Sequence, residues 1–274
     1  MKVYLVTDLE GVSGVSGFDL RDSVHPQDVE MRRQWSGLWM AEVNAAIEGA
    51  VAAGAEDILV VDNHGPGDTL PAQSLAAPAR ILHGGQRRTW LEDLDDSFAA
   101  VLIIGQHAMA GAPGGHLRHT YSRRRLEWVG LHGREIGEIG LIVHIAAESG
   151  VPVVFLSGDL AATTEIQACV PGVVTAAVKE GRTKHCCVST APLVSQAMIR
   201  AGVEDALRQR DQITPQRLEP PIELRLRYHS RSGWRAGARW LRGGKGLGWR
   251  GGRELRVRGE SVRIAWDRAI GLSR

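Results

Sequence analysis

Four short runs of apolar residues recur in the first 160 residues, and they constrain the fold more than any other feature. Each run is almost continuous rather than alternating, which is typical of strands in a sheet that is covered on both faces. The predicted strands are residues 3–6, 58–61, 101–104 and 151–156. Helical stretches separate the runs, and repeated strand–helix–strand units indicate parallel strands. The sequence therefore predicts an α/β fold, with a three-layer sheet that carries helices on both faces.

Two helices are predicted within this first part of the chain. Residues 40–53 are rich in alanine and end before Gly54, and residues 137–149 end before Gly150, which is the residue type favoured just after a helix. The remaining chain has the pattern of a smaller C-terminal α+β portion. We therefore expect an α/β core over residues 1–160 and an α+β region over residues 161–274. The elements expected in that region are helices at 163–169 and 192–208, strands at 173–178, 222–227 and 254–257, and a short final helix.

Charge is distributed unevenly along the chain. Residues 1–200 carry a net charge of −7, whereas residues 201–274 carry +9, which indicates two regions with different surfaces that contact each other or a neighbouring subunit. Arg, Trp and Gly crowd residues 230–252. No apolar run approaches the roughly 18–20 residues of a membrane span, and acidic residues follow the first strand too closely for a signal peptide. We expect a cytoplasmic protein without a membrane partner.

Side chains that can bind a metal follow three of the predicted strands at the point where each strand ends. Asp8 and Glu10 follow the first strand, His64 follows the second, and His107 follows the third. In an open α/β sheet, the carboxyl ends of the strands line the crevice where ligands bind. Glu138, at the start of a predicted helix, adds a third carboxylate. The sequence therefore predicts a metal site at this edge of the sheet.

Two imidazoles and three carboxylates suit zinc, with manganese or cobalt as weaker alternatives. Five side chains exceed what one catalytic zinc usually takes from a protein, but they suffice for two ions if one carboxylate bridges. Asp8 is the best bridge because it lies closest to its strand and has the shorter side chain. Asp62, which also follows the second strand, is interpreted as the cap of a turn.

A loop rich in Gly and Pro, residues 111–120, follows the third strand and can hang over the same crevice. It carries His116 and His119, and an imidazole is well suited to acid–base catalysis near neutral pH. The residues alone leave the choice between the two histidines open.

At these residues the sequence resembles the zinc D-aminopeptidases of the DppA type. The similarity begins at the segment TDLEGVSG, residues 7–14, and covers roughly residues 1–225. It continues through the segments VDNH, GQHA, RHT, GEIGL, SGD and VTAAVK. The order and spacing of these segments are far more specific than any one of them.

The resemblance implies a dinuclear zinc site in which Asp8 bridges the two ions, and it assigns the catalytic role to His119, which precedes Thr120. The remaining ligands that it implies are Glu10, His64, His107 and Glu138. It also implies an aminopeptidase that removes the N-terminal residue of short peptides containing D-amino acids, such as D-Ala-D-Ala. Such enzymes form homodecamers of stacked pentameric rings, and we expect a ring-type homo-oligomer.

Two other functions stay open on the residues. Two-metal sites also serve phosphoester hydrolases, although the chain has no glycine-rich phosphate loop. In residues 230–252, Trp234, Trp240 and Trp249 alternate with arginines and could stack on single-stranded nucleic acid. A subunit contact or a solvated loop is the favoured interpretation of that segment.

Overall fold

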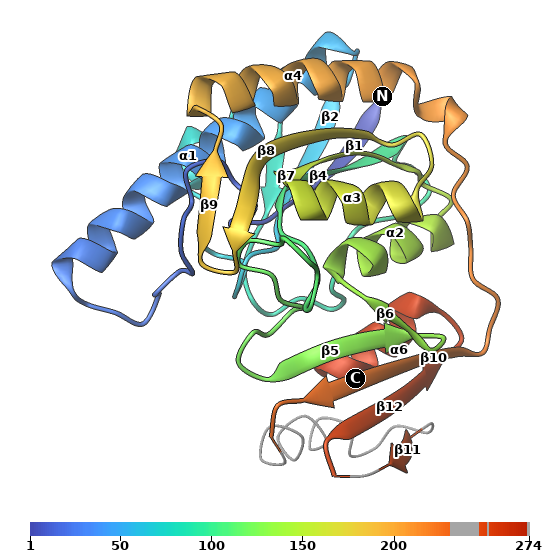
Figure 1. The fold of residues 1–274 in the computed structure, drawn as a ribbon. Coiled ribbons are helices and arrows are strands. Elements are labelled where there is room, and N and C mark those ends of the chain that lie inside the picture. Colours follow the sequence, from blue (N-terminus) through green and yellow to red (C-terminus); the bar gives the residue numbers. More distant parts are fainter. Residues whose placement is uncertain (231–246, 251, 273–274) are drawn as a thin grey trace.

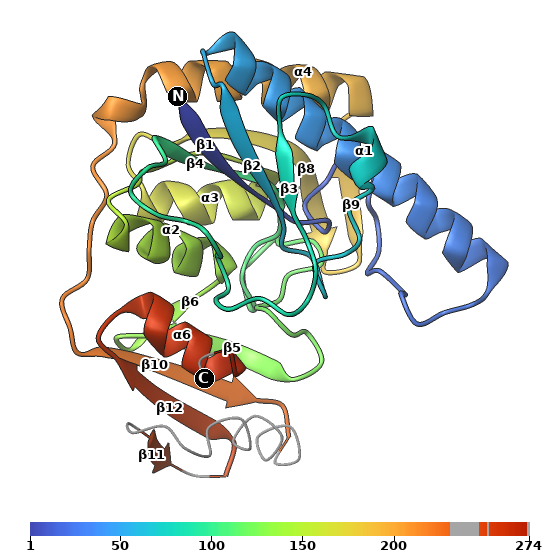
Figure 2. The same ribbon diagram turned by 180° about the vertical axis from the view of Figure 1, so that it is seen from behind.

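The computed structural model describes residues 1–230, 247–250 and 252–272 of the 274-residue chain. Most of the Arg/Trp/Gly-rich segment, residues 231–246 and 251, lies outside the described residues. Within the described part the strands form two sheets, and the smaller one lies below the larger one in Figure 1 and in Figure 2. The large sheet has the order β3 (Arg80–Leu82), β2 (Asp57–Asp62), β1 (Lys2–Thr7), β4 (Ala100–Gln106), β7 (Val153–Asp159), β8 (Val174–Thr183) and β9 (Cys186–Ser189).

The four apolar runs form the centre of the large sheet, as predicted. β1 pairs in parallel with β2 on one side and with β4 on the other, so that Leu5 lies beside Val60 and Leu102. β3, β7 and β8 continue the parallel sheet, and β9 is antiparallel to β8 at one edge. Because neighbouring strands run in the same direction, their carboxyl ends meet at one edge of the sheet.

Helices cover both faces of the large sheet, which confirms the predicted three-layer α/β fold. α1 (Pro26–Ala52) and α4 (Pro192–Arg208) pack together on one face. α2 (Glu138–Glu148) and α3 (Leu160–Cys169) pack on the other face. Figure 1 shows the two helix pairs on opposite sides of the strands.

Successive residues of β1 enter different cores, because the side chains of a strand alternate between its two faces. Val3 and Leu5 pack into the core beneath α1 and α4, whereas Tyr4 and Val6 pack into the core beneath α2 and α3. All four side chains are fully buried. Two apolar faces explain why the sequence of this strand is continuously apolar.

Helix α1 begins at Pro26, well before the predicted start at residue 40. The prediction was wrong because it relied on apolar periodicity, and in residues 26–38 Trp35 is the one buried side chain. Proline is favoured in the first turn of a helix, where its missing N–H would have no partner. The exposed first half of α1 projects from the body of the molecule in Figure 1.

The smaller sheet is antiparallel, and three of its five strands come from the predicted C-terminal α+β region. Its order is β11 (Leu247–Arg250), β12 (Glu254–Gly259), β10 (Ile222–Tyr228), β5 (Leu126–Leu131) and β6 (Arg134–Ile136). The β5–β6 hairpin comes from within residues 1–160, whereas β8 and β9 of the large sheet come from residues 161–274. Each sheet thus contains strands from both sides of residue 160. The division of the chain into two domains at that residue stays a prediction. Short 3₁₀ turns, η1 (Ala72–Ser74) and η2 (Arg210–Gln212), lie in connecting segments.

Helix α6 (Val262–Ile270) packs on the small sheet and also contacts the body of the protein. The fully buried ring of Trp266 meets the rings of Trp90 and Tyr121 edge to face, with centroids 5.6 and 5.2 Å away. Asp267 accepts a hydrogen bond of 3.0 Å from the backbone N–H of Trp90. In the described part of the chain, no helix combines the length and the apolar character that crossing a membrane requires.

Candidate metal centre

The five side chains predicted to bind metal meet at the carboxyl edge of the large sheet. Asp8 follows β1 directly and Glu10 lies in the turn after it, while His64 and His107 lie just beyond β2 and β4. Glu138 is the first residue of α2. Each of these residues is at most 7% exposed. The structure thus brings together residues from three neighbouring strands and one helix.

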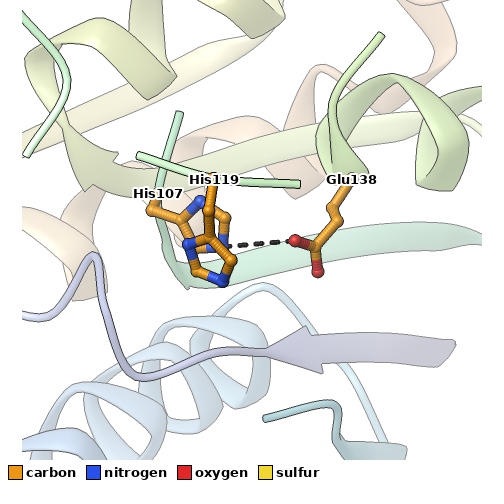
Figure 3. Close-up of side chains that lie close together, drawn as sticks. All are labelled: His107, His119 and Glu138. Atoms are coloured by element: carbon orange, nitrogen blue, oxygen red, sulfur yellow. Dashed lines mark ion pairs between the residues drawn. The ribbon is translucent and has the colours of Figure 1, made fainter. Parts of the chain in front are cut away.

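Asp8 lies between the two imidazoles. Its Oδ1 is 3.1 Å from His64 Nδ1, and its Oδ2 is 3.3 Å from His107 Nε2. Glu10 Oε2 lies 3.1 Å from the same His64 nitrogen, and Glu138 Oε1 lies 3.3 Å from the same His107 nitrogen. Figure 3 shows this last contact as a dashed line. The arrangement has two ends, each with one imidazole and one glutamate, and Asp8 belongs to both.

A glycine permits the close approach of β4 to Asp8. Gly105 has a φ of +71°, and a Cβ atom at this position would lie 2.2 Å from the carbonyl oxygen of Asp8. Its own carbonyl accepts a hydrogen bond of 2.7 Å from the backbone N–H of Gly11. A larger residue would force apart the strand ends that carry Asp8 and His107.

His119 lies at the end that contains His107 and Glu138. Its ring stacks on the ring of His107, with centroids 3.8 Å apart and an interplanar angle of 16° (Figure 3). His119 Nδ1 lies 2.8 Å from the carbonyl oxygen of Leu117, so this nitrogen donates its proton and leaves Nε2 as an acceptor. His116 is fully buried and does not line the cavity at the metal centre, although His119 does.

The loop that carries His119 holds two bulky residues in the left-handed conformation. Leu117 has a φ of +53° and Tyr121 has a φ of +60°, a conformation that costs about 1–2 kcal/mol for a residue with a Cβ atom. Both residues use their backbone at the site. Leu117 accepts the hydrogen bond from His119, and the N–H of Tyr121 donates a hydrogen bond of 2.7 Å to Glu138 Oε1. The left-handed backbone at these two residues therefore orients a candidate ligand, Glu138, and a candidate catalytic group, His119.

The pKa values of these groups reflect a local excess of negative charge. Burial, together with repulsion from the neighbouring Glu10 carboxylate, raises the pKa of Asp8 to about 7. Burial opposes protonation of His107, but Glu138, Asp8 and Glu10 outweigh burial and raise the pKa of this imidazole to about 10. The pKa of His64 is also well above its usual value, because the carboxylates around it outweigh its burial. The site therefore favours added positive charge.

His119 behaves in the opposite way. Burial lowers the pKa of its imidazole to about 4, and the charge of His107 contributes in the same direction. An imidazole with this pKa is neutral near pH 7 and can accept a proton.

The donor set fits a metal centre. His107 Nε2 is buried and makes no hydrogen bond with any described residue, whereas buried polar atoms normally have a partner. Two groups of three residues have their ligand atoms within 4.8 Å of one another. The first group is Asp8, Glu10 and His107, and the second is His107, His119 and Glu138. Imidazole nitrogens and carboxylate oxygens at such spacing suit zinc.

Several residues around this centre were missed in the sequence. Gln106 donates a hydrogen bond of 3.2 Å to Asp8 Oδ2, and Asp19 Oδ2 lies 3.5 Å from His64 Nε2. Lys179 is buried and donates to the carbonyl oxygens of Glu10 and Val15, which fixes the turn after β1. Gln106 adjoins His107 in the sequence, but Asp19 and Lys179 lie far from the ligands that they support, and no spacing identifies them.

Asp62 caps the loop after β2, as predicted. Its carboxylate accepts hydrogen bonds from the backbone N–H groups of His64, Thr69 and Leu70 at 3.3, 2.7 and 2.8 Å. The loop thereby presents His64 toward Asp8.

A cavity of about 430 Å³ opens at the metal centre. The five candidate ligands and His119 line its inner part, and its remaining wall includes Phe18, Tyr121 and several arginines. A space of this size can take a small peptide.

Comparison with known proteins identifies the family. A model of the family described as D-aminopeptidase matches residues 1–266. The chain belongs to the D-aminopeptidase family. A D-aminopeptidase of Bacillus subtilis strain 168 is 30% identical over an alignment of 229 residues, and the match covers 81% of this chain and 78% of the relative.

This D-aminopeptidase also shares its fold with a solved structure. That structure is the Zn-dependent D-aminopeptidase DppA from Bacillus subtilis, described as a self-compartmentalizing protease. The TM-score is 0.88 and the sequence identity 24%, and the match covers 99% of this chain and 96% of the other. Membership of the D-aminopeptidase family makes the chain a peptide hydrolase, which decides between the peptide and phosphoester alternatives in favour of the peptide.

Proposed function

We propose that this D-aminopeptidase holds two zinc ions between its five buried side chains and that Asp8 is shared by both. The observation that carries the proposal is the position of Asp8, whose two carboxylate oxygens face two different imidazoles. Glu10 and His64 lie at one end of the cluster, and His107 and Glu138 lie at the other. The Zn-dependent relative from Bacillus subtilis supports the choice of zinc.

The proposed reaction is removal of the N-terminal residue from short peptides that contain D-amino acids, such as D-Ala-D-Ala. The family match and the curated relative, both described as D-aminopeptidase, support this substrate class. Zinc, when bound, supplies a water molecule that ionises near neutral pH and a Lewis acid for the peptide carbonyl. The amino group at the N-terminus of the peptide would bind in its neutral form beside one zinc ion.

His119 is the proposed catalytic residue. Its Nδ1 is held by Leu117, and its depressed pKa keeps Nε2 free of a proton near pH 7. Nε2 accepts a proton from the attacking water and returns it to the leaving amine. Because the ring stacks on His107, its position is fixed relative to a candidate ligand.

Metal analysis combined with peptide assays tests the proposal. The purified protein should hold two zinc ions per chain and cleave D-Ala-D-Ala, and Asp8→Ala should lose both activity and zinc. Asp96→Ala, which removes an exposed carboxylate elsewhere, serves as the matched control and should keep both. Full turnover by a metal-free Asp8→Ala protein would exclude the proposed mechanism.

We also propose that the enzyme is a cytoplasmic ring-type homo-oligomer of ten subunits. The self-compartmentalizing relative supports assembly. Exposed apolar side chains on β9 and the first half of α4 provide a candidate contact surface: Val188, Leu193, Val194 and Met198. The three cysteines are free, which is the usual state in a reducing cytoplasm.

A further inference from the structure

Arginines form part of the wall of the cavity at the metal centre. Three of them, residues 123–125, are consecutive in the sequence between His119 and β5, and Arg21 joins them from the loop after β1. The inner part of the same cavity carries the carboxylates of Asp8, Glu10 and Glu138. A single cavity therefore contains both a carboxylate cluster and a guanidinium cluster.

Arg123 is the one of these four arginines that stacks on an aromatic ring. It is half-buried, and its guanidinium carbon lies 4.3 Å from the centre of the Phe18 ring. Among the described residues, no carboxylate lies within 4.0 Å of Arg123 or of the exposed Arg125. Arg124 lies 4.0 Å from Asp22, and Arg21 lies 3.5 Å from Asp19. Stacking on an aromatic ring orients a guanidinium group but leaves its N–H edge available for a carboxylate.

Phe18 also relates Arg123 to the candidate catalytic residue. The Phe18 ring meets the His119 ring edge to face, with centroids 5.6 Å apart. Together with the 4.3 Å spacing of Arg123 over Phe18, this limits the separation of Arg123 and His119 to at most about three residues of extended peptide, at about 3.3–3.6 Å per residue. Since a hydrogen bond of about 2.8 Å bridges the guanidinium end, a dipeptide of about 7 Å or a longer tripeptide can span the distance from His119 to Arg123.

We propose that Arg123 binds the C-terminal carboxylate of the substrate and that this cavity selects short peptides with a free C-terminus. The inference rests on the proposed aminopeptidase function. A short peptide carries an amino group at one end and a carboxylate at the other. In the zinc-loaded protein the amino end would lie at the metal centre, and the carboxylate end matches the charge of Arg123. Guanidinium and carboxylate form paired, charge-assisted hydrogen bonds, which give this contact both strength and orientation.

Steady-state kinetics on matched peptides test the inference. D-Ala-D-Ala is compared with its C-terminal amide, which keeps the same peptide bond but lacks the terminal charge. The wild-type protein should show a KM for the amide about 10- to 100-fold above that for the free acid, with similar kcat. Arg123→Gln should raise the KM for the free acid by a similar factor and leave the KM for the amide unchanged.

Arg134→Gln provides the matched control, because Arg134 is an exposed arginine of β6 outside the cavity. It should change neither KM. Unchanged turnover of the amide by Arg123→Gln shows that this variant is folded. Calorimetric titration of D-Ala-D-Ala into zinc-loaded His119→Ala protein should show the same dependence on Arg123 when turnover is suppressed.

A third peptide separates the two sources of a carboxylate. The α-amide of D-Ala-D-Glu carries its carboxylate on the side chain alone, and its KM should resemble that of D-Ala-D-Ala amide. A low KM for this peptide that is lost in Arg123→Gln would overturn the assignment to the C-terminus.

Two further outcomes are distinguishable. Equal KM values for the acid and the amide in the wild type, or an equal rise of both in Arg123→Gln, would overturn the inference and leave the aminopeptidase function in place. Absence of turnover of all three peptides by the zinc-loaded wild type would overturn the proposed function itself.

Discussion

Asp8 lies one residue beyond β1, and this position places its short carboxylate between His64 and His107. The same position surrounds it with negative charge from Glu10, so burial and repulsion both raise its pKa. The carboxylates in turn raise the pKa values of His64 and His107, which favours the protonated imidazoles. Protons and metal ions therefore compete for the same cluster.

Zinc binding to the metal-free protein should release protons, and zinc affinity should rise with pH. The pKa of His107 is about 10 and that of His64 is well above its usual value, so both imidazoles are protonated at neutral pH and must lose a proton before they bind an ion. We expect an increase of about 10- to 100-fold in affinity per pH unit near neutrality. Calorimetry in buffers of different ionisation enthalpy measures how many protons are released on zinc binding. A binding enthalpy that is the same in every buffer would contradict this expectation.

His119→Ala should lower kcat by about 10²- to 10⁴-fold and leave the zinc content unchanged. His119 is held by Leu117 through Nδ1 and acts through Nε2 in the proposed mechanism. Plasma emission spectroscopy and steady-state kinetics on the same sample measure the two quantities.

His25→Ala is a suitable control, since His25 is exposed at the start of α1 and its side chain caps nothing. Loss of zinc from His119→Ala together with activity would instead make His119 a ligand.

The candidate site was largely predictable from the sequence, because strand ends in a parallel sheet converge. The six residues Asp8, Glu10, His64, His107, His119 and Glu138 all lie close together. What the sequence left open was the choice between His116 and His119, since both belong to one loop and its path depends on left-handed residues such as Leu117. The supporting contacts of Asp19 and Lys179 arise from tertiary packing, which has no local signature.

At the scale of the elements, the pairing of β1 with β4 places the metal ligands. Gly105 ends the regular part of this pairing with a positive φ and faces the Asp8 carbonyl. Replacement of Gly105 by alanine should therefore disturb both β4 and the end of β1.

Gly105→Ala should lower the free energy of unfolding by about 1–3 kcal/mol more than Gly150→Ala. Both glycines have nearly the same φ, +71° and +73°, and so share a similar conformational penalty. At position 150 an added Cβ meets open space, whereas at position 105 it lies 2.2 Å from Asp8 O. Urea denaturation of the two variants measures the difference, and equal destabilisation would show that the strand ends accommodate the methyl group.

The central strands of the large sheet could be predicted, while its edges could not. The strands β1, β2, β4 and β7 are buried on both faces, so their sequences are almost continuously apolar and can be recognised. β3, β6 and β9 are short strands with mostly exposed or half-buried side chains, so their pairing depends on neighbours rather than on pattern. The first half of α1 was missed for the same reason.

For the whole molecule, the exposed apolar side chains of β9 and α4 should hold subunits together. Leu193 is 80% exposed in the first turn of α4. Leu193→Asp should dissociate the assembly without harming the subunit, because an acidic residue in the first turn stabilises a helix. Sedimentation velocity measures the mass relative to the 29.7 kDa chain.

Arg208→Gln changes the charge of the same helix by the same amount at its far end, where the side chain forms a surface pair with Glu204. This variant should keep its assembly state. An unchanged mass for Leu193→Asp would place the subunit contacts elsewhere.

The contact of Trp266 with Tyr121 connects the C-terminal helix to the metal centre. Tyr121 donates a backbone hydrogen bond to Glu138, and the ring that packs on Tyr121 belongs to α6, far along the sequence. The position of a candidate ligand therefore depends on a helix that supplies no ligand itself, so substitutions in α6 should be felt at the site without touching it.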